Sequence, residues 1–266
     1  ADYFVAPHTE EEIRKIVSLC EEKGIPWFVT GNGSNLVVSD EGYRGVILSV
    51  YKNFQGIETE GSRIRAKAGS MLASISQAAR EAGLSGMEFA SGIPGTLGGG
   101  VRMNAGAYGG EMKDVAAESR YLTRTGEAGV LRGEEQQLTY RHSAFSDGSK
   151  FVTSAVLRLQ KGDKARIRAK MEELAQKRRA SQPLEYPSAG STFKRPVGGY
   201  AAALIDQCGL KGRRVGGAQV SEKHAGFVIN TGTATCADVL ALTDEIRETV
   251  LRETGIALEL EIRRLG

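Results

Sequence analysis

The chain has 266 residues, with 35 Lys and Arg against 32 Asp and Glu, which gives a formal net charge of +3. Its length and 41% hydrophobic content are those of an ordinary globular protein with one large domain or two to three small ones. No apolar run is long enough to cross a membrane and no secretory segment opens the chain. The near-balanced charge argues against nucleic acid as a partner. Cys20, Cys208 and Cys236 lie far apart, which predicts free thiols in a reducing cytoplasm, with neither a disulfide framework nor a metal site.

The first predicted element is a helix that follows Thr9. Thr9 and Glu12 have the spacing of a capping box, and an apolar stripe continues as far as Gly24. Alternating and helical apolar patterns then predict further elements. They are strands at 27–30, 36–38, 64–67 and 151–159, a helix at 71–82 and a strongly charged helix at 164–180.

A domain boundary is predicted near residue 181, where the charged helix ends and Pro183 and Pro187 follow. Beyond it the patterns predict helices at 201–207 and 237–253. A final strand is predicted at 256–265, where apolar and charged residues alternate. The irregular succession of helices and strands indicates an α+β protein with mixed sheets.

Glycine is unusually frequent, with 34 residues, nearly twice the usual share of about 7%. The loop Gly31–Asn35 lies between two predicted strands, so it lacks the helix that a Rossmann fingerprint requires. Taken alone, it fits an ordinary hairpin turn better than an anion-binding nest. A second, denser cluster spans residues 92–100. Because each glycine inside regular structure costs about 0.5–1 kcal/mol, this cluster predicts close approach of the backbone to a ligand, and the two loops together suit a diphosphate.

A resemblance to a known family rests on six motifs that occur in order along nearly the whole chain. They are GNGSNLVVSD, SGIPGTLGGGVRMNAGAYGGE, TYRHSAF, YPSAGSTFKRP, GGAQVSEKHAGFVIN and LELEIRRLG. Together they resemble the UDP-N-acetylenolpyruvoylglucosamine reductases, flavoproteins of bacterial peptidoglycan synthesis. The resemblance implies a two-subdomain FAD-binding fold of the vanillyl-alcohol-oxidase type, at 1–51 and 52–180, followed by an α+β substrate-binding domain at 181–266.

The resemblance also implies that FAD is bound noncovalently, with its pyrophosphate and ribityl chain held by the two glycine-rich loops. The residues so assigned are Gly31, Asn32, Gly33, Ser34, Asn35, Leu36, Ser91, Gly92, Ile93, Pro94, Gly95, Thr96, Gly98, Gly99, Asn104, Ala105 and Gly106.

The activity that the resemblance implies is reduction of the enolpyruvyl ether of a UDP-sugar, with NADPH as hydride donor. Hydride addition to an α,β-unsaturated carboxylate leaves a dianionic enolate, so the site needs a cation and a proton donor. The family's motifs assign the cation to Arg141, the proton donor to Ser191 and assistance in proton transfer to Glu261. Without the motifs, the commoner role for Ser191 is a turn serine that caps its own backbone, and the nearby Ser188 is not assigned a role. The strand pattern does not distinguish Glu261 from Glu259, and the family's terminal motif leaves Glu259 as a solvated residue at the edge of the strand.

Four residues are assigned to substrate binding, namely Tyr140, Lys194, Lys223 and His224. His224 is equally compatible with a packing role. The partners expected are the UDP-sugar enolpyruvyl ether and NADPH, with no nucleic acid, no membrane and no obligatory protein partner.

Three features depart from the family's pattern. The chain opens at ADYFVAP without the Thr- and Gly-rich segment that usually precedes it and helps to build the FAD subdomain. The compact stretch 140–191 resembles the shorter class, which lacks a mobile tyrosine loop over the substrate. Arg195 stands where other members have Asn.

The alternative function is an FAD-dependent oxidase of a small hydroxy acid or alcohol on the same fold. Neither glycine-rich loop contains the His or Cys that often tethers flavin in such enzymes.

Overall fold

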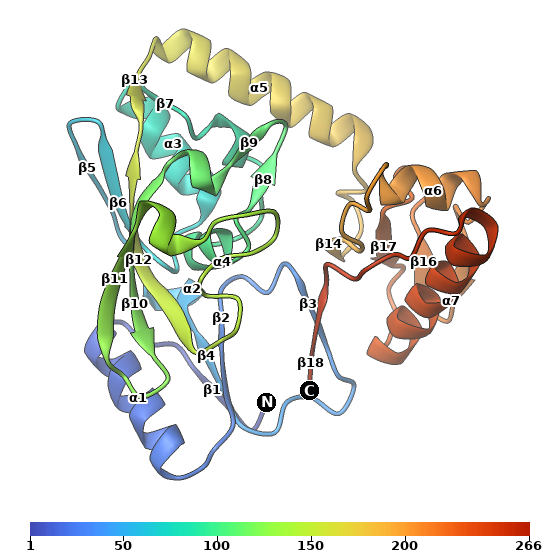
Figure 1. The fold of residues 1–266 in the computed structure, drawn as a ribbon, viewed down its shortest axis with the longest axis horizontal. Coiled ribbons are helices and arrows are strands. Elements are labelled where there is room, and N and C mark those ends of the chain that lie inside the picture. The colour runs from blue at the N-terminus through green and yellow to red at the C-terminus, as the bar shows by residue number, and fades with distance from the viewer. The chain divides into compact units, whose positions relative to one another are not determined.

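The computed structural model describes all residues from 1 to 266, and the chain divides into two compact units (Figure 1). The first unit comprises Ala1–Asn32 and Arg44–Gln176, and the second comprises Gly33–Tyr43 and Lys177–Gly266. A short segment of the N-terminal half, Gly33–Tyr43, thus belongs with the C-terminal residues. The three-part division at 1–51, 52–180 and 181–266 stays a prediction.

The first unit begins with a parallel sheet of three strands in the order β1-β4-β2. The strands are β1 (Tyr3–Val5), β2 (Trp27–Thr30) and β4 (Val46–Ser49). The predicted first helix is α1 (Glu10–Glu22), and its cap hydroxyl on Thr9 accepts a hydrogen bond from the N–H of Glu12 at 3.1 Å. The Glu12 carboxylate accepts from the N–H of His8 instead of Thr9, so only half of the predicted capping box forms.

An antiparallel sheet of five strands follows, in the order β11-β10-β12-β6-β5. Its strands are β5 (Ile57–Glu60), β6 (Arg63–Lys67), β10 (Ala116–Thr123), β11 (Ala128–Arg132) and β12 (Lys150–Arg158). The strands predicted at 64–67 and 151–159 correspond to β6 and β12, and the helix predicted at 71–82 is α3 (Leu72–Glu81).

One hydrophobic core joins the two sheets of the first unit. Its fully buried members include Ile13 on α1, Leu48 on β4, Ile64 on β6, Leu72 on α3 and Leu157 on β12. The smaller elements of this unit are α2 (Val50–Asn53), β7 (Leu84–Ser85), α4 (Leu97–Arg102), β8 (Gly106–Ala107), β9 (Gly110–Glu111) and β13 (Gln160–Lys161), with 3₁₀ turns at Glu88–Ala90, Met112–Asp114 and Gly133–Gln136.

The second unit is built on an antiparallel sheet in the order β14-β17-β16-β15. Its elements are β14 (Ser188–Ser191), α6 (Ala201–Gln207), β15 (Arg214–Val215), β16 (Ala218–Val220), β17 (Phe227–Asn230) and α7 (Cys236–Thr254). The helices predicted at 201–207 and 237–253 are α6 and α7. A reciprocal capping box between Thr235 and Asp238 opens α7, and Gly255, with φ of 72°, closes it. Leu242, Ile246 and Val250 on α7 are fully buried in the core of this unit.

The segment Gly33–Tyr43 is attached to the second unit by two sets of contacts. Strand β3 (Leu36–Val38) pairs in parallel with β18 (Arg263–Leu265). The carboxylate of Asp40 accepts hydrogen bonds from the first N–H groups of α7, at 2.7 Å from Cys236 and 3.0 Å from Ala237. The interpretation of Gly31–Asn35 as a hairpin turn is therefore wrong, because β2 pairs with β4 and β3 pairs with β18.

The predicted strand at 256–265 is too long, since only Arg263–Leu265 joins a sheet. The alternation of buried and exposed residues is nevertheless present, with Leu258 and Ile262 buried and Glu259 exposed. Residues 259–261 run extended beside residues 192–194, but only an isolated bridge forms there, so the stretch is not a ladder.

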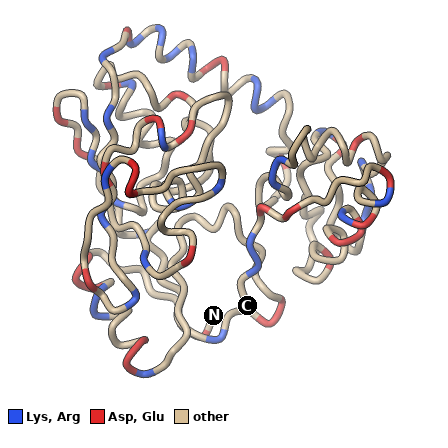
Figure 2. The backbone as a smooth tube through the Cα atoms, viewed as in Figure 1, with Lys and Arg blue, Asp and Glu red and all other residues tan.

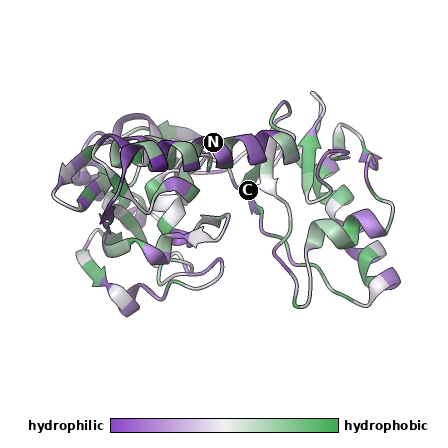
Figure 3. Ribbon diagram, turned by 90° about the horizontal axis from the view of Figure 1, so that it is seen from above, coloured by the Kyte–Doolittle hydropathy of each residue, from purple (hydrophilic) through white to green (hydrophobic).

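The charged helix predicted at 164–180 is α5 (Lys164–Ser181). Basic and acidic residues are interspersed along it (Figure 2), and hydrophilic residues occupy much of its length (Figure 3). Only Ile167 and Leu174 are buried, and pairs such as Arg168 with Glu172 at 2.7 Å support the exposed turns. None of the helices is both long enough and apolar enough to span a bilayer.

Candidate active site

The two glycine-rich loops meet in the first unit. The Asn32 side-chain amide donates a hydrogen bond to the carbonyl of Pro94 at 2.8 Å. Gly31 lies so close to Thr96 that a Cβ at residue 31 would collide with the Thr96 hydroxyl. Residue 31 must therefore be glycine for the loops to approach, and this requirement comes from the protein itself.

The second glycine-rich cluster contains a short helix that was not predicted from the sequence. In α4, three consecutive glycines, residues 98–100, adopt helical conformation despite their low helix propensity. Packing disfavours a side chain at two of them, since a Cβ on Gly98 would lie 2.9 Å from the Cβ of Ala68 and one on Gly100 would lie 3.1 Å from Leu72 Cδ1. The available signal was Thr96 as a cap, followed by Leu97 and Val101 at helical spacing.

Gly99 differs from its two neighbours. It is exposed, and a Cβ built there would meet no atom closer than the Thr96 hydroxyl at 3.8 Å. Packing of the protein does not explain this glycine, whereas close approach of a ligand does.

Thr96 supplies a polar atom that has no partner. Its hydroxyl is buried at the start of α4, and no hydrogen bond reaches it. A buried polar group without a partner costs about 1–3 kcal/mol, and a polar ligand on this surface would remove that cost. An orphaned hydroxyl beside the open face of Gly99 therefore fits the polar chain of a dinucleotide such as FAD.

Arg141 is held in a strained turn of the first unit. Thr139 and His142 exchange two backbone hydrogen bonds of 3.1 Å, which leaves Tyr140 and Arg141 as the two central residues. Arg141 has φ of 55°, a left-handed conformation that costs a non-glycine residue about 1–2 kcal/mol. Its guanidinium lies 5.1 Å from the centre of the half-exposed Tyr140 ring. Such strain persists only where the surroundings enforce it, which marks this turn as a candidate functional feature.

In the second unit, Ser188 and Ser191 have different environments. The Ser188 hydroxyl accepts a hydrogen bond from the N–H of Gly190 at 3.4 Å, which is the local role expected of a turn serine. The exposed Ser191 hydroxyl has no hydrogen-bond partner within the protein, and Gly190, with φ of 82°, bends the strand just before it.

Glu261 lies opposite Thr192, the residue that follows Ser191, because the N–H of Glu261 donates to the carbonyl of Thr192 at 2.9 Å. The carbonyl of Glu261 also accepts from the side chain of Asn35 at 3.0 Å, which ties the first glycine-rich loop to the C-terminal residues. Glu259, which the strand pattern alone does not distinguish from Glu261, carries an exposed carboxylate that pairs with Lys194 Nζ at 2.9 Å.

Lys223 and His224, which are also assigned to the substrate, have partners within the protein. Lys223 lies 3.8 Å from the carboxylate of Glu185. The half-buried His224 accepts a hydrogen bond from Gly226 at 3.1 Å and packs edge-on against Phe227. Burial lowers the pKa of His224 below its usual value, because the half-buried ring is less able to carry a charge. These contacts favour the packing role for His224. Arg195 stacks 4.2 Å from the centre of the Tyr200 ring.

The remaining residues assigned to the cofactor are distributed over both units. Gly33, Ser34 and Leu36 belong to the second unit, and Ser91, Gly92, Ile93, Gly95, Ala105 and Gly106 belong to the first. The Ser91 hydroxyl bonds to the Glu88 carbonyl, and Asn104 is buried at the end of α4. No group of His, Cys, Asp and Glu side chains is arranged to hold a metal ion.

Comparison with known proteins finds two family models that match successive parts of the chain. Residues 1–131 match a family model described as an FAD binding domain, and residues 182–265 match the C-terminal domain of UDP-N-acetylenolpyruvoylglucosamine reductase. A reductase of that name from Syntrophomonas wolfei is 49% identical over the whole chain and 89% of the relative. The chain belongs to the UDP-N-acetylenolpyruvoylglucosamine reductase family.

A second relative and a solved structure support membership of the same family. The reductase from Geobacillus kaustophilus is 46% identical over the whole chain and 87% of that relative. The crystal structure of the reductase from Thermus caldophilus superposes with a TM-score of 0.85 and 36% identity, covering 99% of this chain and 92% of the other. The resemblance predicted from the six motifs is thus confirmed, as is the α+β fold with an FAD-binding part and a C-terminal substrate-binding domain.

Proposed function

We propose that this family member reduces the enolpyruvyl ether of UDP-N-acetylglucosamine to UDP-N-acetylmuramate, a step of peptidoglycan precursor synthesis, with noncovalent FAD and with NADPH as electron donor. The observation that carries the proposal is the match of residues 182–265 to a domain model of these reductases, within a likeness that extends over the whole chain. No observation favours the alternative of an oxidase acting on a small hydroxy acid or alcohol. The three free cysteines support a cytoplasmic location.

The reaction makes two demands on the protein's own residues. Electron transfer from NADPH to the double bond is the chemistry that bound FAD supplies. Addition to an α,β-unsaturated carboxylate builds negative charge on the carboxylate and leaves one carbon that must gain a proton. The protein therefore has to place a cation at the carboxylate and an acid at the carbon.

Arg141 and Ser191 suit these two tasks. A guanidinium is always charged and binds a carboxylate through two parallel hydrogen bonds, and the strain at Arg141 supports a positioned rather than a solvated side chain. Ser191 has an exposed hydroxyl with no partner in the protein, so it is available to a substrate. A serine is a weak acid, and Glu261, on the adjoining extended segment, is the residue we assign to assist its proton transfer.

Lys194 and Tyr140 complete the proposed substrate contacts. Lys194 suits the diphosphate because it is a cation on the same short segment as Ser191, and Tyr140 adjoins Arg141. The ammonium group of Lys194 lies 2.9 Å from the exposed carboxylate of Glu259.

Two measurements test the proposal. The purified protein should show the visible absorption bands of flavin, and acid should release the flavin because it is not covalently attached. In anaerobic stopped flow, NADPH should bleach the flavin band and the UDP-sugar enolpyruvyl ether should restore it. Colourless protein, or a bleached band that the enolpyruvyl ether does not restore, would refute the function.

Glu261 and Glu259 form a matched pair for the assignment of roles. Glu261→Gln should slow restoration of the band by about 10²-fold or more, the usual contribution of acid–base assistance. Glu259→Gln removes an exposed ion pair worth at most about 1 kcal/mol. It should therefore change KM for the UDP-sugar by no more than about fivefold and leave kcat unchanged. Equal losses of kcat in the two variants would contradict the assignment.

A further inference from the structure

Asn104 stands where a glycine would be the simplest choice. It directly follows the cap residue of α4, and the N–H groups of Asn104 and Ala105 bond back to the carbonyls of Val101 and Gly100 at 3.1 and 2.8 Å. This is the Schellman ending, which calls for a left-handed residue at this point, most often glycine. Asn104 has φ of 41° and is only 1% exposed. A side chain at this position therefore needs an explanation of its own.

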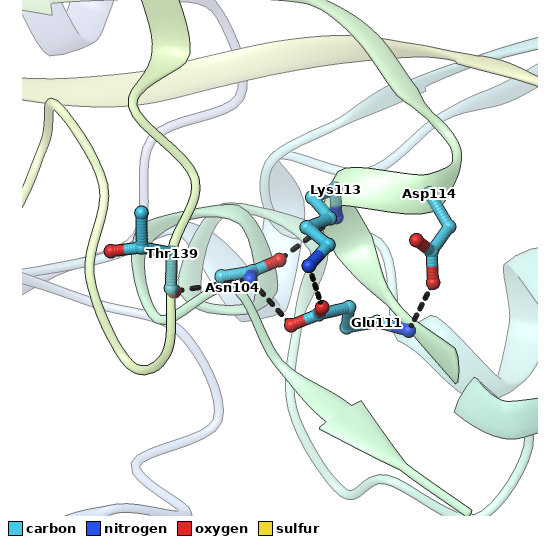
Figure 4. Close-up of polar contacts among 5 residues, drawn as sticks. All are labelled: Asn104, Glu111, Lys113, Asp114 and Thr139. Carbon is cyan, nitrogen blue, oxygen red and sulfur yellow. Dashed lines mark hydrogen bonds and ion pairs between the residues drawn. The ribbon is translucent and has the colours of Figure 1, made fainter. Parts of the chain in front are cut away.

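The explanation lies in the contacts of the Asn104 amide, which are drawn in Figure 4. Its Oδ1 accepts from the N–H of Lys113 at 2.8 Å. Its Nδ2 donates to Glu111 Oε2 at 2.7 Å and to the carbonyl of Thr139 at 3.1 Å. Since both donor hydrogens and the acceptor are engaged within the protein, the amide is held in one orientation.

The Thr139 carbonyl is the point where this network reaches the strained turn. The same oxygen accepts the N–H of His142, which closes the turn around Tyr140 and Arg141. Asn104 therefore fixes one end of the two-residue turn that keeps Arg141 left-handed. The Lys113 ammonium pairs with the other carboxylate oxygen of Glu111, Oε1, and does not contact the turn (Figure 4).

We infer that Asn104, oriented by Glu111, is a positioning residue for Arg141 rather than a contact of the cofactor, as the sequence motif had suggested. The inference rests on the proposed function, in which Arg141 binds the carboxylate of the substrate. Helix α4 thus connects two parts of the site, with Thr96 and Gly99 near its start and the support of Arg141 at its end. Six residues of α-helix span about 9 Å.

The test is a double-mutant cycle between Asn104 and Arg141 in the FAD-loaded protein. Asn104→Gly removes the amide while keeping a residue that favours the left-handed conformation, so the end of α4 is preserved. We expect restoration of the flavin band by the enolpyruvyl ether to slow by about 10- to 100-fold, the cost of a small misplacement of a catalytic group. In an Arg141→Ala background, Asn104→Gly should change that rate by less than about twofold, because its effect passes through Arg141.

Three further readouts separate positioning from a general loss of structure. The FAD content and the rate of bleaching by NADPH should equal those of the wild type. Without any turnover, amide hydrogen exchange should be faster in peptides that contain residues 139–142. Lys113→Met is the matched control, since it removes the exposed ion pair to Glu111 and leaves the Asn104 bonds in place. It should leave all of these values unchanged.

Several results would overturn the inference. Equal effects of Asn104→Gly with and without the Arg141 side chain would show that Asn104 does not act through Arg141. Loss of FAD from Asn104→Gly would show a direct role in cofactor binding. If Arg141→Ala alone restored the band at the wild-type rate, the assigned role of Arg141 would be wrong, and that failure is distinct from the first two. If Asn104→Gly does not fold, Glu111→Ala removes the acceptor that orients the amide and should give the same cycle.

Discussion

Substituting Gly99 by alanine should stabilise the apoprotein and weaken FAD binding at once. Gly99 lies in the first half of α4 with an ordinary helical backbone, and a Cβ there meets no atom closer than 3.8 Å. Alanine is favoured over glycine inside a helix by about 0.5–1 kcal/mol. The added methyl group occupies the open face beside the Thr96 hydroxyl, where the ligand is expected to approach.

The two effects have opposite signs and are measured separately. After release of the flavin, thermal unfolding of Gly99→Ala should shift upward by about 2–4 °C, and the fluorescence of Trp27, the single tryptophan, offers a probe. Titration of the apoprotein with FAD should show affinity at least about tenfold weaker, which corresponds to about 1.4 kcal/mol. An ordinary destabilising substitution would lower both quantities.

Gly98→Ala is the control on the neighbouring residue. Its Cβ would lie 2.9 Å from the Cβ of Ala68, so overpacking of about 1–3 kcal/mol should lower the unfolding temperature of the apoprotein. If Gly99→Ala were stabilised and still bound FAD with wild-type affinity, no ligand would lie against this face of α4, and the placement of the cofactor loop would be refuted.

Other predictions concern the second unit. Ser191→Ala should leave bleaching by NADPH near the wild-type rate and slow restoration by the enolpyruvyl ether about 10²–10⁴-fold, whereas Ser188→Ala should leave both rates unchanged. Stopped flow measures both rates, and a Ser191→Ala defect confined to bleaching would contradict the role. Burial lowers the pKa of His224, so the unfolded chain binds more protons than the folded one and stability should decline as the pH falls below about 6.5. In His224→Gln, the unfolding temperature should fall less between pH 7.5 and 5.5 than it does in the wild type. An equal fall in both proteins would exclude His224 as the source of the pH dependence. Asp40→Ala should lower the stability of the second unit by about 1–2 kcal/mol, because it removes the acceptor of the first two N–H groups of α7; an unchanged denaturant midpoint would refute this.

Elements marked by local chemistry could be predicted from the sequence. Thr9 and Thr235 mark the starts of α1 and α7, and the apolar stripes define their buried faces. Helix α4 could not be predicted because its three glycines disfavour a helix locally, and the packing reason for Gly98 and Gly100 lies in Ala68 and Leu72, far away in sequence.

The candidate site shows the same division between local and long-range information. The motifs could indicate Ser191 and Glu261, but not that Ser188 would take the local capping role or that Glu259 would pair with Lys194. The pairing of β3 with β18 had no local signal either, because a strand's own pattern does not name its partner.

The membership of Gly33–Tyr43 in the second unit has a consequence for synthesis on the ribosome. The hydrogen bond from Asn35 to Glu261 joins residues 226 positions apart. At about 5–20 residues per second, the segment waits roughly 10–45 s after leaving the ribosome before its partners are translated. During that time Leu36, Val37 and Val38 have no strand to pair with, so this apolar segment is the part of the nascent chain where we expect a chaperone to bind.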